Sequence, residues 1–413
     1  MSKQIREGYK QTKVGIIPED WEVVKVENLG ALIGGGTPST KNEDFWNGTI
    51  PWISSSDLDE NSIYNISVSR FINENAIKNS ATKLIPKNSI LIVSRVGVGK
   101  IAINDQLLCT SQDFQSLVLN RDNHHFIAYE IKNEIQKLIT YNQGTSIKGF
   151  VKNDLLGLQI PLPPLEEQEK IAEVLTTWDD AIELQENLIG EKESLKKGLM
   201  QKLLGGEVRF REFTDKWKET KLGEVIKLQG GYAFKNKEFK KSGIPIVRIS
   251  NISNTSNYME MNDLVYYNEL SNDNNFIIKK NDLLIAMSGA TTGKVSIYNL
   301  EQKAYLNQRV GLFKSLKPSL IDYGFLIQFV FSNIFSSQLT SLLVAGAQPN
   351  ISSKDIESLK IKLPSLQEQQ KIAEVLSLAD NEIELLKNEL DELKLQKKGL
   401  MQKLLTGKVR VEI

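Results

Sequence analysis

Two glycine-rich segments that end in lysine invite a phosphate-binding interpretation. They are GVGK at 97–100 and GATTGK at 289–294. A Walker loop places four residues between its first glycine and the Gly-Lys pair, and follows the lysine with Ser or Thr. Here the spacers have one and three residues, and Ile101 and Val295 follow the lysines. We therefore expect two hairpin turns, either with Lys100 and Lys294 near a phosphate backbone or with a purely structural role.

A second group of polar residues has the chemistry needed to read base edges. Arg pairs with guanine, and Gln or Asn pairs with adenine, through two hydrogen bonds. For each candidate, an ordinary surface role is the alternative. The candidates in the predicted loops are Thr37, Arg95, Gln112, Gln143 and Thr145 in the first part of the chain, and Arg248, Asn251, Gln308, Arg309 and Gln348 in the second.

Residues for catalysis or metal binding are scarce. Cys109 is the single cysteine and His124 and His125 are the two histidines, so neither a disulfide framework nor a zinc spacing exists. The Asn/Asp-Pro-Pro-aromatic tetrapeptide and the glycine-rich cofactor loop of an adenine methyltransferase are also missing. We expect a non-catalytic chain without cofactor or metal of its own, with Cys109 as a small buried apolar residue.

The composition is that of a globular protein of more than one domain. The chain has 413 residues, 40% hydrophobic and 25% charged, with a formal net charge of zero. The N-terminal stretch lacks the apolar core of a secretory signal, and the most apolar stretch, 325–335, is too short and polar for a membrane span. We expect a buried helix there, no membrane partner, and a location in the cytoplasm.

A long internal repeat indicates the elements that must position these loops. Residues 162–204 and 363–405 agree at 26 of 43 positions at an offset of 201. The repeats are acidic, whereas residues 211–362 carry 20 basic and 14 acidic residues. This asymmetry permits nucleic-acid binding by the regions outside the repeats without establishing it.

Each repeat has the apolar spacing of a coiled-coil helix. Apolar residues recur in a 4-3 pattern over about five heptads, interrupted at Gln185, Lys192 and Lys196 in the first copy and at Lys397 in the second. Each copy starts after a proline and ends at a glycine. We predict that the two helices pair within the chain, although each helix packing only on its own domain is the alternative. The predicted contact residues for the helix pair and for partner docking are Ile171, Leu175, Trp178, Ile182, Ile372, Leu376, Ile383, Leu386 and Leu390.

The regions before the two repeats resemble each other faintly. KNSILIVSRVGVGKIAI (87–103) parallels KNDLLIAMSGATTGKVSI (280–297), and Gln112 corresponds to Gln308. Short β-branched runs broken by Gly, Pro and Asn indicate strands, and residues 125–139 and 322–343 have helical spacing. We predict two α+β domains with one skeleton and different loops.

The motifs together resemble the specificity subunits of type I restriction–modification systems. The resemblance rests on GYKQTKVGIIPEDWEVVKV (8–26), the GxGK-like hairpin, and PLPPLEEQEKIAEVL with its second copy. It covers essentially the whole chain and is most specific in the two helix starts.

The resemblance implies the fold and the partners. It implies two target-recognition domains (1–160 and 208–362), each followed by a long helix (161–207 and 363–413), with the helices forming an intramolecular antiparallel coiled coil of pseudo-two-fold symmetry. Each domain would read one half of a bipartite, asymmetric site in double-stranded DNA. Two methylase subunits would dock on the helices and restriction subunits would join them, so that S-adenosylmethionine, ATP and Mg²⁺ belong to the partners. The alternatives are a coiled-coil scaffold carrying two protein- or sugar-binding domains, and a self-contained methyltransferase or nuclease.

Overall fold

The computed structural model describes residues 5–141, 149–253, 256–271, 275–345 and 350–412. The chain divides into two compact units. Unit 1 comprises residues 1–186 and 389–413, and unit 2 comprises residues 187–388. Each unit contains one globular domain and a portion of both long helices.

In the described residues, the globular domain of unit 1 is built on two four-stranded sheets. Its helices are α1 (Glu74–Lys78), α2 (His124–Tyr141) and α3 (Lys152–Leu156). Its strands are β1 (Tyr9–Thr12), β2 (Gly15–Pro18), β3 (Glu22–Lys25), β4 (Gly30–Gly34), β5 (Ile50–Ile53), β6 (Arg70–Ile72), β7 (Leu84–Ile85), β8 (Ile90–Val93), β9 (Ile101–Ile103), β10 (Leu108–Thr110), β11 (Phe114–Leu119) and β12 (Gln159–Leu162). The sheets have the orders β4-β11-β8-β9 and β6-β5-β10-β7, and β12 pairs with β3.

The domain of unit 2 repeats this architecture. Its helices are α5 (Tyr323–Phe331), α6 (Asn333–Ala345) and α7 (Ser353–Glu357). Its strands are β13 (Lys218–Lys221), β14 (Ile226–Gly230), β15 (Ile244–Val247), β16 (Val265–Tyr267), β17 (Ile277–Ile278), β18 (Leu283–Ala286), β19 (Val295–Ile297), β20 (Ala304–Leu306), β21 (Val310–Ser315) and β22 (Lys360–Leu363). The sheets β14-β21-β18-β19 and β16-β15-β20-β17 have the strand orders of the first domain with ten added to each number. The predicted shared α+β skeleton is confirmed.

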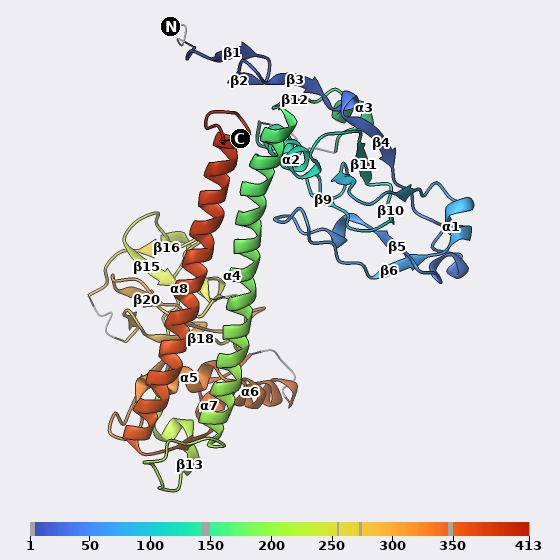
Figure 1. The fold of residues 1–413 in the computed structure, drawn as a ribbon. Helices are drawn as coiled ribbons and strands as arrows, with labels where there is room; N and C mark the ends of the chain where they lie inside the picture. Colours follow the sequence, from blue (N-terminus) through green and yellow to red (C-terminus); the bar gives the residue numbers. More distant parts are fainter. Residues whose placement is uncertain (1–4, 142–148, 254–255, 272–274, 346–349, 413) are drawn as a thin grey trace. The chain divides into compact units, whose positions relative to one another are not determined.

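The two repeats form the long helices α4 (Leu165–Gly205) and α8 (Leu366–Leu404), which run side by side (Figure 1). Cross-helix ion pairs give their direction. In unit 1, Lys397 pairs with Asp179, and the Lys394 ammonium lies 2.7 Å from Glu186. In unit 2, the Lys387 ammonium lies 2.6 Å from Glu193, and Lys196 pairs with Asp380. Residue numbers fall along α8 as they rise along α4, so the pair is antiparallel, as predicted.

The helix ends are part of each domain's hydrophobic core. In unit 1, Ile171 and Leu175 of α4 and Leu404 and Leu405 at the end of α8 pack in one cluster with Trp21. In unit 2, the corresponding cluster contains Leu203 and Leu204 together with Ile372 and Leu376. A helix leaving one domain therefore finishes inside the core of the other unit's domain, which ties each helix terminus to a globular domain by apolar burial.

Residues 322–343, predicted as one helical stretch, form two helices, α5 and α6, bent by 58° between them. The break falls at Ser332, whose backbone is extended and whose hydroxyl donates to the carbonyl of Phe329 at 2.6 Å. Phe325, Leu326, Phe329 and Val330 of α5 are buried in the core. Among the described residues no single helix is long and apolar enough to cross a membrane, and only the bent pair passes that test by length and composition.

Candidate nucleic-acid interface

Three loops of the first domain are held together at one edge of its sheets by backbone hydrogen bonds. The amide of Gly36, after β4, donates to the carbonyl of Thr110 at 2.8 Å. The amide of Ser94, after β8, donates to Asp113 at 2.8 Å, and Phe150 donates to Ser94 at 2.9 Å. The loops after β4 and β8 and the turn between β10 and β11 therefore converge where the described chain resumes after residue 148.

Candidate base-reading side chains of the first domain lie on this edge. Arg95 is exposed and follows Ser94 directly. Thr37 and Gln112, also exposed, are joined by a hydrogen bond from the Thr37 hydroxyl to the Gln112 side-chain oxygen. The backbone at Gly35 lies so close to the backbone at Ser111 that only glycine fits there. A Cβ on Gly35 would lie 2.0 Å from the Ser111 carbonyl oxygen.

The second domain brings the same three loops together through the same bonds. Tyr232 after β14 donates to Leu306 at 2.8 Å, and Met287 after β18 donates to Arg309 at 2.9 Å. The amide of Ile351 donates to the Met287 carbonyl at 2.9 Å, as Phe150 does to Ser94. The edge is thus a property of the skeleton and not of one domain.

The exposed side chains on this second edge differ from those on the first. Gln308 and Arg309 are both exposed in the turn between β20 and β21. Tyr232, 48% exposed, stacks on Phe276 with ring centroids 5.1 Å apart. The edge therefore offers a guanidinium, an amide and an aromatic face, whereas the first edge offers Arg95 and the Thr37–Gln112 pair.

The two glycine-lysine segments are β-hairpins, as the sequence predicted, since β8 pairs with β9 and β18 with β19. Both turns need glycine, because Gly97 and Gly289 have φ angles of +82° and +86°. Their lysines differ. Lys100 donates to the carbonyls of Ser55 and Leu58, at 3.2 and 2.8 Å. The exposed Lys294 has no ion-pair or hydrogen-bond partner for its ammonium among the described residues.

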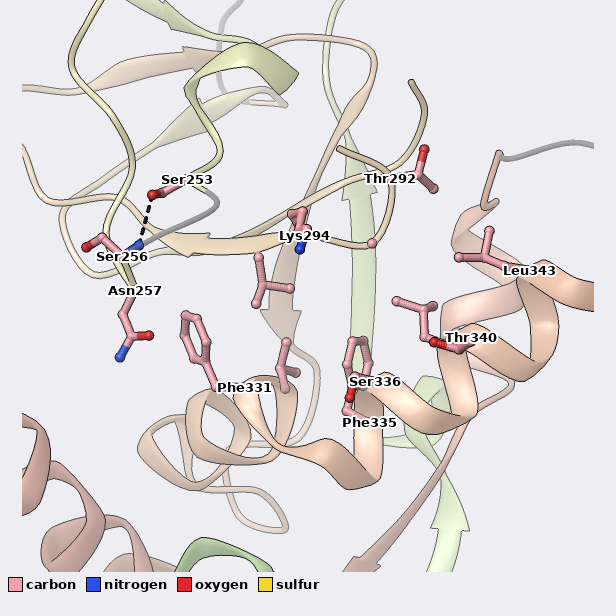
Figure 2. A pocket seen from close by; sticks show the side chains of 14 residues that line it. Ser253, Ser256, Asn257, Thr292, Lys294, Phe331, Phe335, Ser336, Thr340 and Leu343 are labelled. Atoms are coloured by element: carbon pink, nitrogen blue, oxygen red, sulfur yellow. Dashed lines mark hydrogen bonds between the residues drawn. The ribbon is translucent and has the colours of Figure 1, made fainter. Parts of the chain in front are cut away.

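Lys294 also lines a cavity of about 470 Å³ in the second domain. Figure 2 shows it between the loop that carries Ser253 and Asn257 and the helices that carry Phe331 and Thr340. Hydroxyl, amide and aromatic groups surround it, and none of the described residues that line the cavity is acidic. An anionic group at this position would meet a lysine whose charge is not neutralised.

Two second-domain candidates are engaged inside the protein. Asn251 is fully buried; its side-chain oxygen accepts from the Arg248 amide at 3.0 Å and its amide donates to Asn262 at 3.1 Å. Arg248 donates from its guanidinium to the Asp263 carbonyl at 2.6 Å. These bonds fix the loop after β15, so Asn251 acts as a loop brace and presents no edge to a ligand. Gln143, Thr145 and Gln348 lie outside the described residues.

The predicted helix contacts fall into two groups. Ile171, Leu175, Ile372, Leu376 and Ile383 are buried. Trp178, Ile182, Leu386 and Leu390 are half-buried.

The breaks predicted in the apolar seam are polar cross-helix contacts. Gln185 bonds Glu389 at 3.2 Å, Lys192 lies 2.5 Å from Glu382, and Lys196 and Lys397 pair with Asp380 and Asp179. The two aspartates were not among the residues predicted from the sequence. Their spacing of 201, equal to that of the two lysines, was the available signal.

Within the part of the chain that the structure describes, no three His, Cys, Asp or Glu residues are grouped to hold a metal ion. Cys109 is fully buried in β10, as expected, and burial raises the pKa of its thiol to about 11.

The fold and its two matching loop edges define a class: a chain with two homologous α+β domains carried on one antiparallel helix pair. Comparison with known proteins gives the family. The model of the type I restriction modification DNA specificity domain matches residues 18–193 and 214–395. The chain belongs to this family.

Individual relatives match over nearly the whole length. The chain is 29% identical over 420 residues to the type I restriction enzyme MjaVIII specificity subunit of Methanocaldococcus jannaschii, covering 98% of this chain and 97% of that protein. It is 24% identical to the EcoKI specificity subunit of Escherichia coli K12, covering 87% and 82%. The crystal structure of a type I S subunit from M. genitalium has the same fold, with a TM-score of 0.59, 19% identity, and coverage of 95% and 96%.

Proposed function

We propose that this chain is the DNA-recognition subunit of a type I restriction–modification complex in the cytoplasm of its cell. Each domain reads one half of a bipartite, asymmetric site in double-stranded DNA. The helices dock two methylase subunits, restriction subunits join this core, and the assembly directs N6-adenine methylation and restriction. The chain supplies specificity and performs no catalysis, so S-adenosylmethionine, ATP and Mg²⁺ act on the partner subunits.

One observation carries the proposal. The same three loops converge in both domains through matching backbone bonds, yet the exposed polar side chains on them differ. A rigid frame that presents variable loops is how binding proteins change specificity without changing fold. Two frames with different side chains would read two different half-sites, which makes the complete site asymmetric.

The residues proposed to read bases are the exposed ones on these edges. Arg95, Thr37 and Gln112 serve the first domain, and Gln308 and Arg309 serve the second. Lys294 is the proposed phosphate contact, because its ammonium is not engaged within the described residues. Gln143, Thr145 and Gln348 remain candidates from the sequence. Arg248 and Lys100 are assigned to loop support with Asn251, on the strength of their bonds to backbone carbonyls.

Exposed leucines on the helices support methylase docking. Leu184 on α4 and Leu385 on α8 occupy matching positions of the two repeats and are 70% and 63% exposed. Exposed apolar side chains are typical of protein–protein contact where they gather in one patch, and we take these leucines as part of such a patch. Because the repeats are alike, each would offer a similar surface to one methylase subunit. The other exposed leucines in the two helices are Leu165, Leu188, Leu195, Leu378 and Leu395.

The proposal is tested by co-expressing the chain with its methylase subunit in a host without adenine methylation, and then sequencing the methylated adenines. The expected result is one motif made of two short half-sites separated by a gap of constant length. The methylase expressed without this chain is the control and should leave no motif. A motif that does not depend on this chain, or methyl transfer by the purified chain alone, would contradict the proposal.

A further inference from the structure

Two lysines interrupt the apolar seam of the helix pair, one in each unit. Lys196 of α4 and Lys397 of α8 are 201 residues apart and therefore occupy matching positions of the repeat. Each pairs with an aspartate of the opposite helix, Asp380 and Asp179, which are also 201 apart. Both lysine side chains are 12% exposed, and the aspartates are 26% and 13% exposed. These are ion pairs inside the protein, one in each unit.

The recognition domain provides a third member to each pair. Lys397 contacts one carboxylate oxygen of Asp179, and the Tyr129 hydroxyl donates to the other. In unit 2, Lys196 contacts one oxygen of Asp380, and the Gln328 side-chain amide donates to the other at 2.9 Å. Each seam aspartate is thus shared between the opposite helix and the domain.

Tyr129 and Gln328 occupy the same position in the two domains. Each is the sixth residue of its helix, α2 or α5, and these helices follow β11 and β21 in matching topology. The side chains differ in chemistry but place a donor on the same oxygen of the equivalent aspartate. Both domains therefore make this bond to the aspartate, although the donor is a tyrosine in the first domain and a glutamine in the second.

Other contacts strengthen each junction. In unit 1 the Lys397 ammonium lies 5.0 Å from the centroid of the Tyr129 ring, and the Tyr64 hydroxyl is 3.3 Å from that of Tyr129. In unit 2 the Asn257 side-chain amide donates to Asp380 at 3.3 Å. Charged hydrogen bonds are directional, so these clusters resist rotation and sliding in a way that leucine contacts do not.

A seam of leucines alone leaves the alignment of two helices weakly specified, because a slip of one heptad places leucine against leucine again. A polar residue at one seam position specifies a single register, since any other register buries an unpaired charge. Here the same aspartate that specifies helix register also holds the domain. Register and domain orientation are therefore set by one group in each unit.

We propose that Asp179 and Asp380 are positioning residues that set the length of the gap between the two half-sites. This inference rests on the proposed function. Neither aspartate touches DNA in this role. Each acts through the domain donor, Tyr129 or Gln328, by holding its recognition domain at one orientation on its end of the helix pair. Loss of the junction lets a domain swing, so that sites with longer or shorter gaps are accepted.

The test uses the complete methylase complex and a plasmid library in which the gap varies by one or two base pairs around the natural length. The main variant is Lys196→Met with Asp380→Leu, which removes the ion pair while keeping the seam filled by apolar side chains. Gln328→Leu removes only the bond from the domain. Lys197→Met, at the exposed neighbour of Lys196, is the matched control.

The expected result is that methylation at gaps one base pair too long or too short rises at least tenfold relative to the natural gap in the double variant. Gln328→Leu should show a smaller rise, and Lys197→Met none. The half-site sequences should stay unchanged. A purely structural role would lower methylation at all gaps in proportion, and this outcome would overturn the inference.

The controls separate the two proposals. If the unaltered complex methylates no bipartite motif, the proposed function fails. If it methylates one gap strictly and both variants stay equally strict, only the positioning role fails. Should the double variant not assemble, Gln328→Leu decides, because the ion pair between the helices is left in place.

Discussion

Arg410 and Glu167 form an ion pair with two hydrogen bonds although 243 residues separate them along the chain. The Arg410 Nε lies 2.6 Å from one carboxylate oxygen and its Nη2 lies 2.8 Å from the other. Trp21 Nε1 also donates to this fully buried carboxylate, at 2.8 Å. The segment after α8 is thus fastened to the start of α4.

Unit 2 has the same arrangement, an Arg–Glu ion pair joined by a Trp side chain, which we call the clasp. Arg209, which follows α4, bonds Glu368 near the start of α8 at 2.9 and 2.8 Å, and Trp217 donates at 3.1 Å. The glutamates are 201 residues apart, as are the arginines. The Glu-Gln pair of the repeated helix start is therefore structural. The neighbouring Gln369 accepts from the amide of Asp322, which caps α5.

Replacing Arg410 by alanine should destabilise unit 1, because among the described residues it leaves Trp21 as the remaining donor to the buried Glu167 carboxylate. We expect a loss of roughly 2–3 kcal/mol in the free energy of unfolding, below the range for a fully buried pair because Arg410 is 38% exposed. Denaturant unfolding with hydrogen exchange resolved to each unit measures this. Lys408→Ala, at an exposed position nearby, should change little. Equal protection in the Arg410→Ala protein and the parent would show that the clasp is not needed.

Replacing Leu386 by aspartate should separate the helices, whereas the same change at Leu385 should not. Leu386 is half-buried and Leu385 is 63% exposed. A charge in the seam costs more than about 2 kcal/mol, so specific DNA binding should be lost. Leu385→Asp should keep the helix content and lose affinity for the methylase subunit. Circular dichroism and subunit pull-down measure the two effects, and normal DNA binding by Leu386→Asp would place the seam elsewhere.

The two hairpin lysines should respond differently to substitution by alanine. Lys294→Ala should weaken binding to all DNA sequences alike and lower the slope of log affinity against log salt by about one. Lys100→Ala should destabilise the loop at Ser55 and Leu58 and leave the salt slope unchanged. Salt titrations of DNA binding distinguish them. Arg309→Ala should instead relax one base position, at a cost of about 1–3 kcal/mol.

Unit 1 should lose stability as the pH falls below neutrality because of His125. Burial, with the neighbouring His124, lowers the pKa of His125 to about 4 against an ordinary value of 6.5. Between these values the unfolded chain binds a proton that the folded chain does not, so stability falls as pH decreases from 6.5 to 4. The free energy of unfolding is measured at pH 7 and at pH 4.5 for the parent and for His125→Gln. The parent should lose about 1–2 kcal/mol more between these pH values than the variant, a figure that is already reduced for the partial exposure of His125. An identical pH dependence in the two proteins would contradict this.

Exchanging residues 211–362 for the corresponding region of another specificity subunit should change one half-site only. The first domain is intact in such a hybrid, and the helices that hold both domains are unchanged. The other half-site should persist in the methylated motif, read by sequencing methylated adenines. The gap should persist as well when the incoming region keeps a hydrogen-bond donor for Asp380 at the position of Gln328. A hybrid in which both half-sites changed together would rule out independent reading by the two domains.

The sequence by itself was enough for the large-scale organisation. The 201-residue repeat, its 4-3 apolar spacing and its proline and glycine boundaries predicted two helices that the structure has at Leu165–Gly205 and Leu366–Leu404. Periodicity works for such helices because one apolar stripe over about five heptads has few other ways to be buried. The hairpins at GVGK and GATTGK followed from local turn chemistry. The division of 322–343 into two helices did not, because the helical spacing of the sequence continues through Ser332, where the backbone is extended.

Only the tertiary structure decided which polar residues are free and which are engaged. Lys100 and Lys294 look alike in the sequence, but one bonds two carbonyls 42 and 45 residues away and the other faces a cavity. Asn251 had the chemistry of a base reader and is buried in its own loop. In the sequence, Lys196 and Lys397 only interrupt the apolar spacing of the helices. In the structure they contact aspartates that lie 184 and 218 residues away along the chain. Spacing along a chain predicts which face of an element is apolar, whereas the partner of a charge depends on what the fold brings beside it.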